Sequence, residues 1–337
     1  MDALLDVRGL TVDLPTERGW IRPVNDVSFA LAPGETLGIV GESGSGKTML
    51  SLALLGLTPP GARRTGEAWL HARAEDATVR GTRRVDLIGA TNGSLREIRG
   101  HEIAMIFQEP MTALNPVMRV GAQIEEAIRT HESQVSGADL QRRAVAALER
   151  TSVPQPELRA RQYPHQLSGG LRQRAMIAMA LAAGPRILIA DEPTTALDVT
   201  VQKQILELLV SLQRDLGLAM IFITHDLGVV AQVAARVAVM YAGRIVEEGP
   251  VQEILREPRH PYTAGLLRAA PRLERGKLTP IPGTVPSLHA LPPGCAFAPR
   301  CEFRRAECDG RVPDLRRVNS THDARCVLAA AEGAQSR

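Results

Sequence analysis

The chain has 337 residues, with 40 Lys and Arg against 37 Asp and Glu, so its formal net charge is only +3. This near balance, without a long run of one sign, argues against nucleic-acid binding, and the 3% aromatic content argues against a base-stacking surface. The 44% hydrophobic content excludes a disordered chain. At roughly 100–200 residues per domain, the length predicts about two domains.

The sequence carries no recognisable membrane or export signal. No stretch approaches the roughly 18 consecutive apolar residues of a membrane-spanning helix. The first residues, Met1-Asp2-Ala3-Leu4-Leu5-Asp6, are unlike a signal peptide. We therefore expect a cytosolic location, where four cysteines indicate metal binding or catalysis before disulfides.

The elements expected in chain order alternate strands with helices. Strands are predicted at 7–14, 24–31 and 37–40, an irregular surface excursion at 61–100, and helices within 120–160. Buried strands are expected at 187–190 and 219–223, with an amphipathic helix at 201–216 between them and a hairpin over 237–246. This order indicates an α/β fold with a mostly parallel sheet. A Pro-rich, linker-like stretch follows at 271–293, and we place a boundary near 256–270.

A phosphate-binding loop is predicted between the strand at 37–40 and a following helix. It matches G-x-x-x-x-G-K-[ST], in which glycines turn backbone N–H groups toward phosphate oxygens and a helix N-terminus adds its dipole. Lys47 would reach the β- and γ-phosphates, and the hydroxyl of Thr48 would bind Mg²⁺. The loop consists of Gly41, Glu42, Ser43, Gly44, Ser45, Gly46, Lys47 and Thr48.

Two further segments suit the same chemistry. Asp191 and Glu192 follow the buried strand at 187–190, where Asp191 would bind Mg²⁺ and Glu192 would polarise the attacking water, although a helix N-cap also explains such pairs. Ser168, Gly169 and Gly170 open a helix and form a second anion-binding arrangement, or an ordinary Ser N-cap. One nucleotide loop with two phosphate-binding helix starts indicates a dimer that shares its sites.

Over about residues 1–255, these motifs resemble the ATP-binding cassette (ABC) ATPases. The resemblance implies a P-loop (RecA-like) cassette with antiparallel β and helical subdomains, the latter at about 110–175. It implies a head-to-tail dimer around two ATP molecules, a Q-loop Gln108 that senses Mg²⁺ and water, a D-loop with Asp198 after Ala196-Leu197, and a switch His225 at the γ-phosphate. Trp20 would stack on adenine or is a half-buried strand residue. A lone His is more often structural, and a lone Gln is more often in a solvated loop.

Two other segments resemble oligopeptide and dipeptide importer ATPases: residues 107–116 and the extension at 256–337, which begins with His260-Pro261-Tyr262-Thr263. The resemblance implies an ATP-driven subunit on the cytoplasmic face of the membrane. Its partners would be a second cassette subunit, for which we expect a heterodimer, two transmembrane permease subunits and an extracytoplasmic solute-binding protein. Nickel, glutathione or another small solute remain alternative cargoes. A non-transport cassette ATPase and a cassette that only signals are remoter alternatives.

The C-terminal cysteines have the spacing C-x₅-C-x₆-C-x₁₇-C, which fits neither a zinc ribbon nor the bacterial ferredoxin pattern. Four thiolates still form a complete ligand set, whose negative charge Arg300, Arg304 and Arg305 could offset. His322 is a weaker candidate ligand, and a solvated loop histidine is the expected alternative. The resemblance to the importers implies a [4Fe–4S] cluster, while zinc or free thiols remain open. The candidate ligands are Cys295, Cys301, Cys308 and Cys326.

Overall fold

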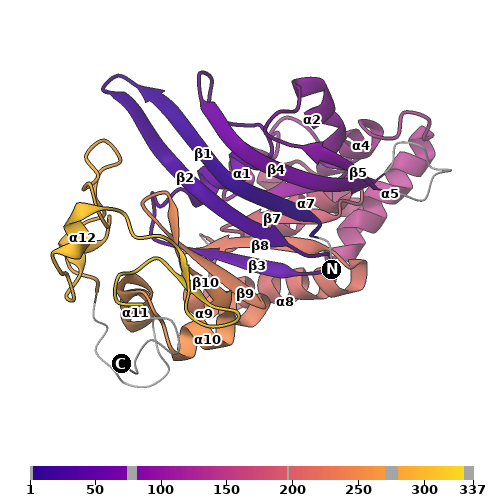
Figure 1. Cartoon of the computed structure of the whole chain (residues 1–337). Coiled ribbons are helices and arrows are strands. Elements are labelled where there is room, and N and C mark those ends of the chain that lie inside the picture. The colour runs from indigo at the N-terminus through magenta and orange to yellow at the C-terminus, as the bar shows by residue number, and fades with distance from the viewer. Residues whose placement is uncertain (1–2, 74–81, 196, 270–279, 330–337) are drawn as a thin grey trace.

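A computed structural model describes residues 3–73, 82–195, 197–269 and 280–329. Two sheets form its centre, with helices around them (Figure 1). The larger sheet has the order β11-β12-β10-β9-β3-β8-β7-β6, and the smaller has the order β2-β1-β4-β5. This confirms the predicted α/β fold with an additional antiparallel sheet.

Five neighbouring strands of the larger sheet run parallel: β6 (Ile103–Ile106), β7 (Ile187–Asp191), β8 (Ala219–Thr224), β3 (Thr36–Val40) and β9 (Arg236–Tyr241). All residues of β3, β6, β7 and β8 are buried, as expected for strands covered on both faces. The predicted hairpin is β9 and β10 (Arg244–Pro250).

The smaller sheet joins β1 (Leu5–Thr16), β2 (Gly19–Leu31), β4 (Arg63–Arg73) and β5 (Thr82–Asp86), all antiparallel. The prediction of an irregular excursion at 61–100 was therefore wrong, since this region supplies β4, β5 and helix α2 (Asn92–Ile98). Only alternate residues of β4, namely Ala68, Leu70 and Ala72, are buried. The first half of β4 is polar and exposed, and His71 follows the short apolar run 68–70, so a search for apolar runs does not find the strand.

Helices cover both faces of the larger sheet. Helix α1 (Lys47–Leu54) packs between the two sheets, with Leu50 and Leu54 in their common core. Helices α8 (Val199–Leu216), α9 (Leu227–Val233) and α10 (Val251–Arg256) pack in a second core on the other face. The predicted amphipathic helix at 201–216 is confirmed, with Ile205, Leu208 and Leu212 buried.

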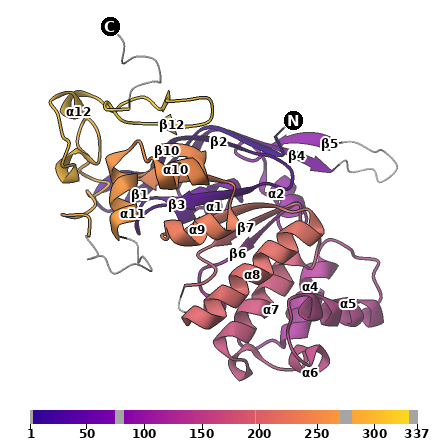
Figure 2. The same cartoon turned by 90° about the horizontal axis from the view of Figure 1, so that it is seen from below.

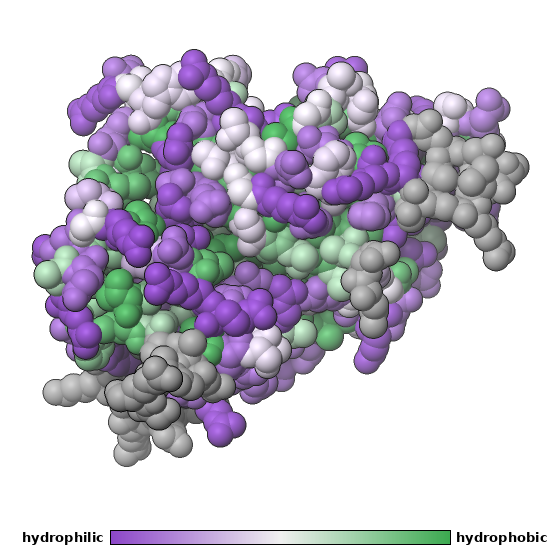
Figure 3. Space-filling view, in the orientation of Figure 1, coloured by the Kyte–Doolittle hydropathy of each residue, from purple (hydrophilic) through white to green (hydrophobic). Residues whose placement is uncertain are grey.

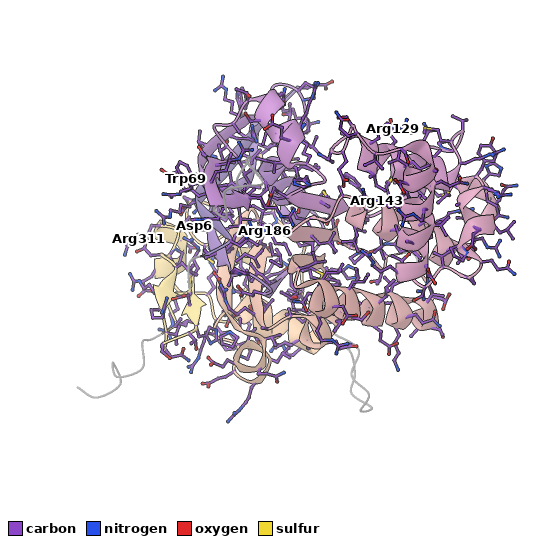
Figure 4. The ribbon with its side chains drawn as sticks, turned by 90° about the vertical axis from the view of Figure 1, so that its right-hand side faces the viewer. Asp6, Trp69, Arg129, Arg143, Arg186 and Arg311 are labelled. Atoms are coloured by element: carbon purple, nitrogen blue, oxygen red, sulfur yellow. The ribbon has the colours of Figure 1, made fainter. Side chains whose placement is uncertain are left out.

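A helical part projects from the sheet and contains its own core (Figure 2). It comprises α3 (Pro110–Ala113), α4 (Val120–Arg129), α5 (Gly137–Arg150), α6 (Pro156–Ala160), η1 (Pro164–Gln166) and α7 (Gly169–Leu181). Figure 4 shows Arg129 and Arg143 on this part, well apart from Asp6 and Trp69 of the smaller sheet. Among the described residues, no helix combines the length and apolar character needed to cross a membrane.

The C-terminal extension packs on the preceding part of the chain and adds strands to the larger sheet. It contains α11 (Pro261–Ala269), η2 (Ala298–Arg300), α12 (Glu307–Gly310), β11 (Arg316–Arg317) and β12 (Asp323–Ala324). Strand β12 pairs with β10, and Phe297 lies against Tyr241 and Tyr262 in the second core. The linker expected at 271–293 falls partly outside the described residues, which omit 270–279.

A buried carboxylate ties the extension to β10. Glu247 is fully buried and accepts hydrogen bonds from the backbone N–H groups of Arg259 (2.5 Å) and His260 (3.0 Å), while His322 Nε2 lies 2.7 Å from its Oε1. His322 is 1% exposed, so the expectation of a solvated loop histidine was wrong. Burial lowers the pKa of His260 to about 4, so this ring is neutral near pH 7.

We expect Glu247→Ala to lower the free energy of unfolding by about 3 kcal/mol, because two backbone N–H groups and the buried His322 ring lose their partner. Urea unfolding followed by circular dichroism measures this change. Glu207→Ala on the exposed face of α8 is the control, with an expected loss below about 0.5 kcal/mol. Equal losses in the two variants would contradict an anchoring role for Glu247.

Candidate functional site

An open cavity of about 1020 Å³ lies at the carboxyl ends of the parallel strands. Four strands lead into it: β3 into the loop at 41–48, β6 toward Gln108, β7 toward Glu192 and β8 toward His225. Ligands in open α/β sheets bind at this edge. In the space-filling view, hydrophilic residues cover much of the outer surface, and apolar residues show mainly in recesses between elements (Figure 3).

The loop at 41–48 has a backbone that only glycine permits at two positions. Gly46 has a φ of 103°, and a Cβ there would lie 2.0 Å from the carbonyl oxygen of Pro23. A Cβ on Gly41 would lie 2.2 Å from the carbonyl oxygen of Met240. Gly46 is also the N-cap of α1, so the loop brings free backbone N–H groups and a helix N-terminus to the cavity.

Lys47 is held inside this loop. Its side chain is 4% exposed, and its Nζ donates to the carbonyl oxygens of Gly41 (2.7 Å) and Glu42 (3.1 Å). Burial lowers the pKa of Lys47, while the nearby Glu192, Asp191 and Glu42 carboxylates oppose that shift. Lys47 Nζ also lies 3.5 Å from Ser45 Oγ and 3.9 Å from Glu192 Oε1, so this buried ammonium group is held mainly by neutral oxygens and suits an anionic ligand.

Four side chains from separate elements converge on the Glu192 carboxylate. Gln108 Nε2 and His225 Nδ1 each lie 3.5 Å from Oε2, and Lys47 Nζ lies 3.9 Å from Oε1. Thr195 Oγ1 donates to Oε2 at 2.9 Å. Glu192 has a φ of 46°, an uncommon backbone conformation that often marks functional sites. Thr195 was not predicted from the sequence, where its position three residues after Glu192 is the one signal for it.

Asp191 ends β7 beside this group and is 1% exposed. Burial raises the pKa of its carboxyl group, whereas a hydrogen bond with the Thr48 side chain acts in the opposite direction. Among the described residues, Asp191 Oδ1 is buried without a hydrogen-bond partner. A carboxylate oxygen and a hydroxyl in contact, with one oxygen unpaired, are donors that Mg²⁺ prefers.

Other predicted residues lie outside this cavity. Ser168 caps α7 through Leu171 N (3.4 Å), and Asp198 caps α8 through Val201 N (3.0 Å). The two helix starts lie next to each other. A Cβ on Gly170 would lie 2.9 Å from the Val201 side chain, and a Cβ on Gly169 would lie 3.8 Å from that of Leu197. Ala196 falls outside the described residues. The structure thus separates residues 168–170 and 198 from the phosphate loop of the same chain.

Trp20 is also absent from the described cavity lining. Its side chain is 46% exposed, with the guanidinium of Arg63 4.1 Å from its ring centroid. Pro23, three residues further along the same strand β2, does line the cavity. A stacking role for Trp20 therefore stays a prediction.

The C-terminal extension supplies one wall of the cavity, which sequence reasoning missed. This wall contains Leu266, Ile281, Val285, Leu288 and Arg300. Arg300 pairs with Glu42 of the phosphate loop, and Arg304 pairs with Asp309 (2.9 Å). Both arginines thus have carboxylate partners, and an effect of their charge on the cysteines stays a prediction. No local pattern marks a contact between residues 258 positions apart.

All four cysteines line one small cavity of the extension. They are free thiols, and burial raises the pKa of Cys295, Cys301 and Cys326. Within the described part of the chain, no three His, Cys, Asp or Glu side chains form a group that could hold a metal ion. The structure thus gathers the predicted ligands without showing a formed metal site.

Comparisons with known proteins agree with this geometry. Residues 24–195 match the ABC transporter family, and residues 246–308 match the C-terminal region of oligopeptide/dipeptide transporters. A Brucella melitensis protein named as a peptide import ATP-binding protein is 51% identical over 332 residues, which cover 96% of each chain. A Brucella abortus protein with the same kind of name is 51% identical over 307 residues, covering 90% of this chain and 89% of that one.

Solved structures give the same result for the fold. The dimeric post-hydrolysis state of the cassette MJ0796, bound to ADP and Pi, has a TM-score of 0.62 and 26% identity. It covers 73% of this chain and 98% of its own. Clostridium perfringens cbiO1, part of the transporter complex cbiONQ, has a TM-score of 0.59 and 26% identity, covering 76% and 92%. The chain belongs to the ABC transporter family.

We expect Glu192→Gln to retain ATP binding and to slow hydrolysis by about 10²–10⁴-fold, because glutamine cannot accept the proton of the attacking water. Equilibrium nucleotide binding and phosphate release measure the two properties. Glu207→Gln on the exposed face of α8 is the matched control and should hydrolyse ATP normally. Turnover of Glu192→Gln within about threefold of the unmodified protein would show that another group is the base.

Proposed function

We propose that the chain is the ATP-hydrolysing subunit of an ABC importer that powers uptake of oligopeptides or dipeptides. The convergence of Lys47, Gln108 and His225 on Glu192, above a loop that presents backbone N–H groups, carries the ATPase part of the proposal. The match of residues 246–308 to oligopeptide/dipeptide transporters and the names of the Brucella relatives support peptides as cargo.

In this proposal, the residues at 41–48 bind the phosphates of ATP, with Lys47 moving from its carbonyl partners to the β- and γ-phosphates. Thr48, Asp191 and Gln108 would hold Mg²⁺, which supplies charge neutralisation at the phosphate oxygens. Glu192 accepts the proton of the attacking water, while Thr195 and Gln108 orient its carboxylate. His225 contacts the γ-phosphate from the end of β8.

A second cassette would complete each site. Ser168, Gly169 and Gly170 present a helix start with no phosphate loop of its own beside it, and Asp198 adjoins them. A head-to-tail dimer brings this surface onto the nucleotide of the partner. The dimeric state of MJ0796 with ADP and Pi supports this arrangement, and we propose a partner cassette of different sequence.

Two permease subunits in the membrane and an extracytoplasmic solute-binding protein would complete the importer, with this chain at the cytoplasmic face. The segment at 107–117, which contains Gln108, supports docking to a membrane subunit, because large apolar side chains are exposed there. Phe107 is 38%, Met111 50% and Val117 80% exposed. A coupling helix that covers them would connect the membrane subunits to Gln108, one residue from Phe107.

For the extension, we propose that Cys295, Cys301, Cys308 and Cys326 hold a [4Fe–4S] cluster with a structural role. The shared small cavity and the four-thiol donor set support it. The described residues show no compact group that could hold a single metal ion, and a [4Fe–4S] cluster would take one thiolate on each of its four irons. The cluster would supply cross-links in a segment with few large apolar residues.

Anaerobically purified protein should contain iron and acid-labile sulfide in equal amounts. A Cys308→Ser variant should lose most of both, because Cys308 is a buried member of the set. Metal and sulfide analysis measures this directly, independently of ATPase activity. Zinc without sulfide would contradict the cluster and favour the alternative metal.

The function itself is tested with the chain reconstituted with its permease and binding-protein partners in lipid vesicles. We expect oligopeptides or dipeptides to stimulate ATP hydrolysis severalfold, because loaded binding protein favours the closed cassette dimer. Nickel and glutathione serve as comparison solutes. Stimulation by nickel or glutathione alone would support the ATPase role and change the proposed solute. A rate of hydrolysis that none of these solutes changes would contradict the importer proposal.

A further inference from the structure

The acidic residue of the phosphate loop has its counterion in the C-terminal extension. Arg300 forms a two-pronged ion pair with Glu42, with Nη1 2.6 Å from Oε2 and Nη2 3.0 Å from Oε1. The Arg300 side chain is only 4% exposed, against 30% for Glu42. This planar pairing is the strongest form of a carboxylate–guanidinium contact.

Neighbouring groups fix the guanidinium in this position. Arg300 Nε donates to the carbonyl oxygen of Pro282 (2.9 Å), and Nη2 also lies 3.4 Å from that of Ile281. The Tyr241 hydroxyl lies 3.4 Å from Nη1. The extension also binds the loop backbone, because the N–H of Glu42 donates to the hydroxyl of the buried Tyr262 at 2.8 Å. Residue 42 is therefore held through both its side chain and its backbone.

The pair stands where a triphosphate would bind. Glu42 and Arg300 line the same cavity as Lys47 and Thr48. An unpaired carboxylate at the second position of a phosphate loop would repel the ligand, and in a partly buried site such repulsion is only weakly screened. Arg300 offsets the contribution of Glu42 to this repulsion, so the carboxylate of the loop no longer opposes the attraction of Lys47 for the ligand.

We propose that Arg300 is a positioning residue for the nucleotide, and that the C-terminal extension thereby completes the ATP site of its own chain. This inference rests on the proposed ATP-binding function. The affinity for ATP would then depend on a residue outside the cassette, because Arg300 offsets the negative charge of Glu42. Arg300 acts through Glu42 and takes no part in the chemical step.

The test measures the dissociation constant for ATPγS, with AMP as a comparison, by calorimetry on the full-length chain. Arg300→Gln should weaken ATPγS binding about tenfold and AMP binding less than about threefold, because repulsion grows with the number of phosphates. Arg304→Gln is the matched control. It removes an exposed arginine of the same extension that pairs with Asp309, and should leave both constants unchanged.

Two further variants separate charge from structure. Glu42→Gln leaves Arg300 without its partner and should tighten ATPγS binding about threefold. The double variant restores neutrality and should bind ATPγS within about threefold of the unmodified chain, whereas a merely structural role for Arg300 predicts a double variant no better than Arg300→Gln. The Glu42→Gln result decides the matter even if Arg300→Gln does not fold.

The outcomes also distinguish this inference from the function beneath it. An unmodified chain that does not bind ATPγS would contradict ATP binding itself, and this inference with it. Other outcomes would overturn only the role of Arg300, provided that the unmodified chain binds ATPγS normally. These are an unchanged dissociation constant in Arg300→Gln, a double variant that does not recover binding, or no tighter binding in Glu42→Gln.

Discussion

Burial of the parallel strands on both faces is the constraint on which the rest of the molecule depends. Strands β3, β6, β7 and β8 have no exposed residue, so neither face can carry a site. Polar side chains therefore collect where these strands end, and parallel pairing brings the ends to one edge. The phosphate loop, Gln108, Glu192 and His225 meet there although they are distant in the chain.

The C-terminal extension is built into this arrangement at two carboxylates. Glu247 anchors it to β10 within the core, and Glu42 binds it at the edge of the cavity. Arg300, which makes the second contact, directly precedes Cys301 of the four-thiol cavity. A conformational change at Cys301 would therefore act directly on the neighbouring residue Arg300, which pairs with Glu42 of the phosphate loop. This arrangement gives the extension a physical connection to the nucleotide site as well as a packing role.

The remaining predicted residues lie on a different surface. Ser168, Gly169, Gly170 and Asp198 start two adjoining helices and cap their own N-termini. A chain with this arrangement has one half-site at the end of its parallel strands and another at its helical part. In the proposed dimer, two cassettes in opposite orientation would bring the two halves together, which would give a physical reason for nucleotide-dependent closure.

The sequence by itself determined the parts that depend on local patterns. The closely spaced glycines before Lys47, the apolar strand before Asp191 and the helical period at 201–216 are each patterns that lie within a short stretch of sequence. Strand β4 was missed because its first half is polar and its apolar run is only three residues long. Only the tertiary structure placed Thr195 on Glu192, buried His322 beside Glu247, and brought Arg300 to Glu42. Such contacts join residues far apart in the chain or depend on side-chain direction, so no periodicity or short motif encodes them, and packing alone decides which charges meet.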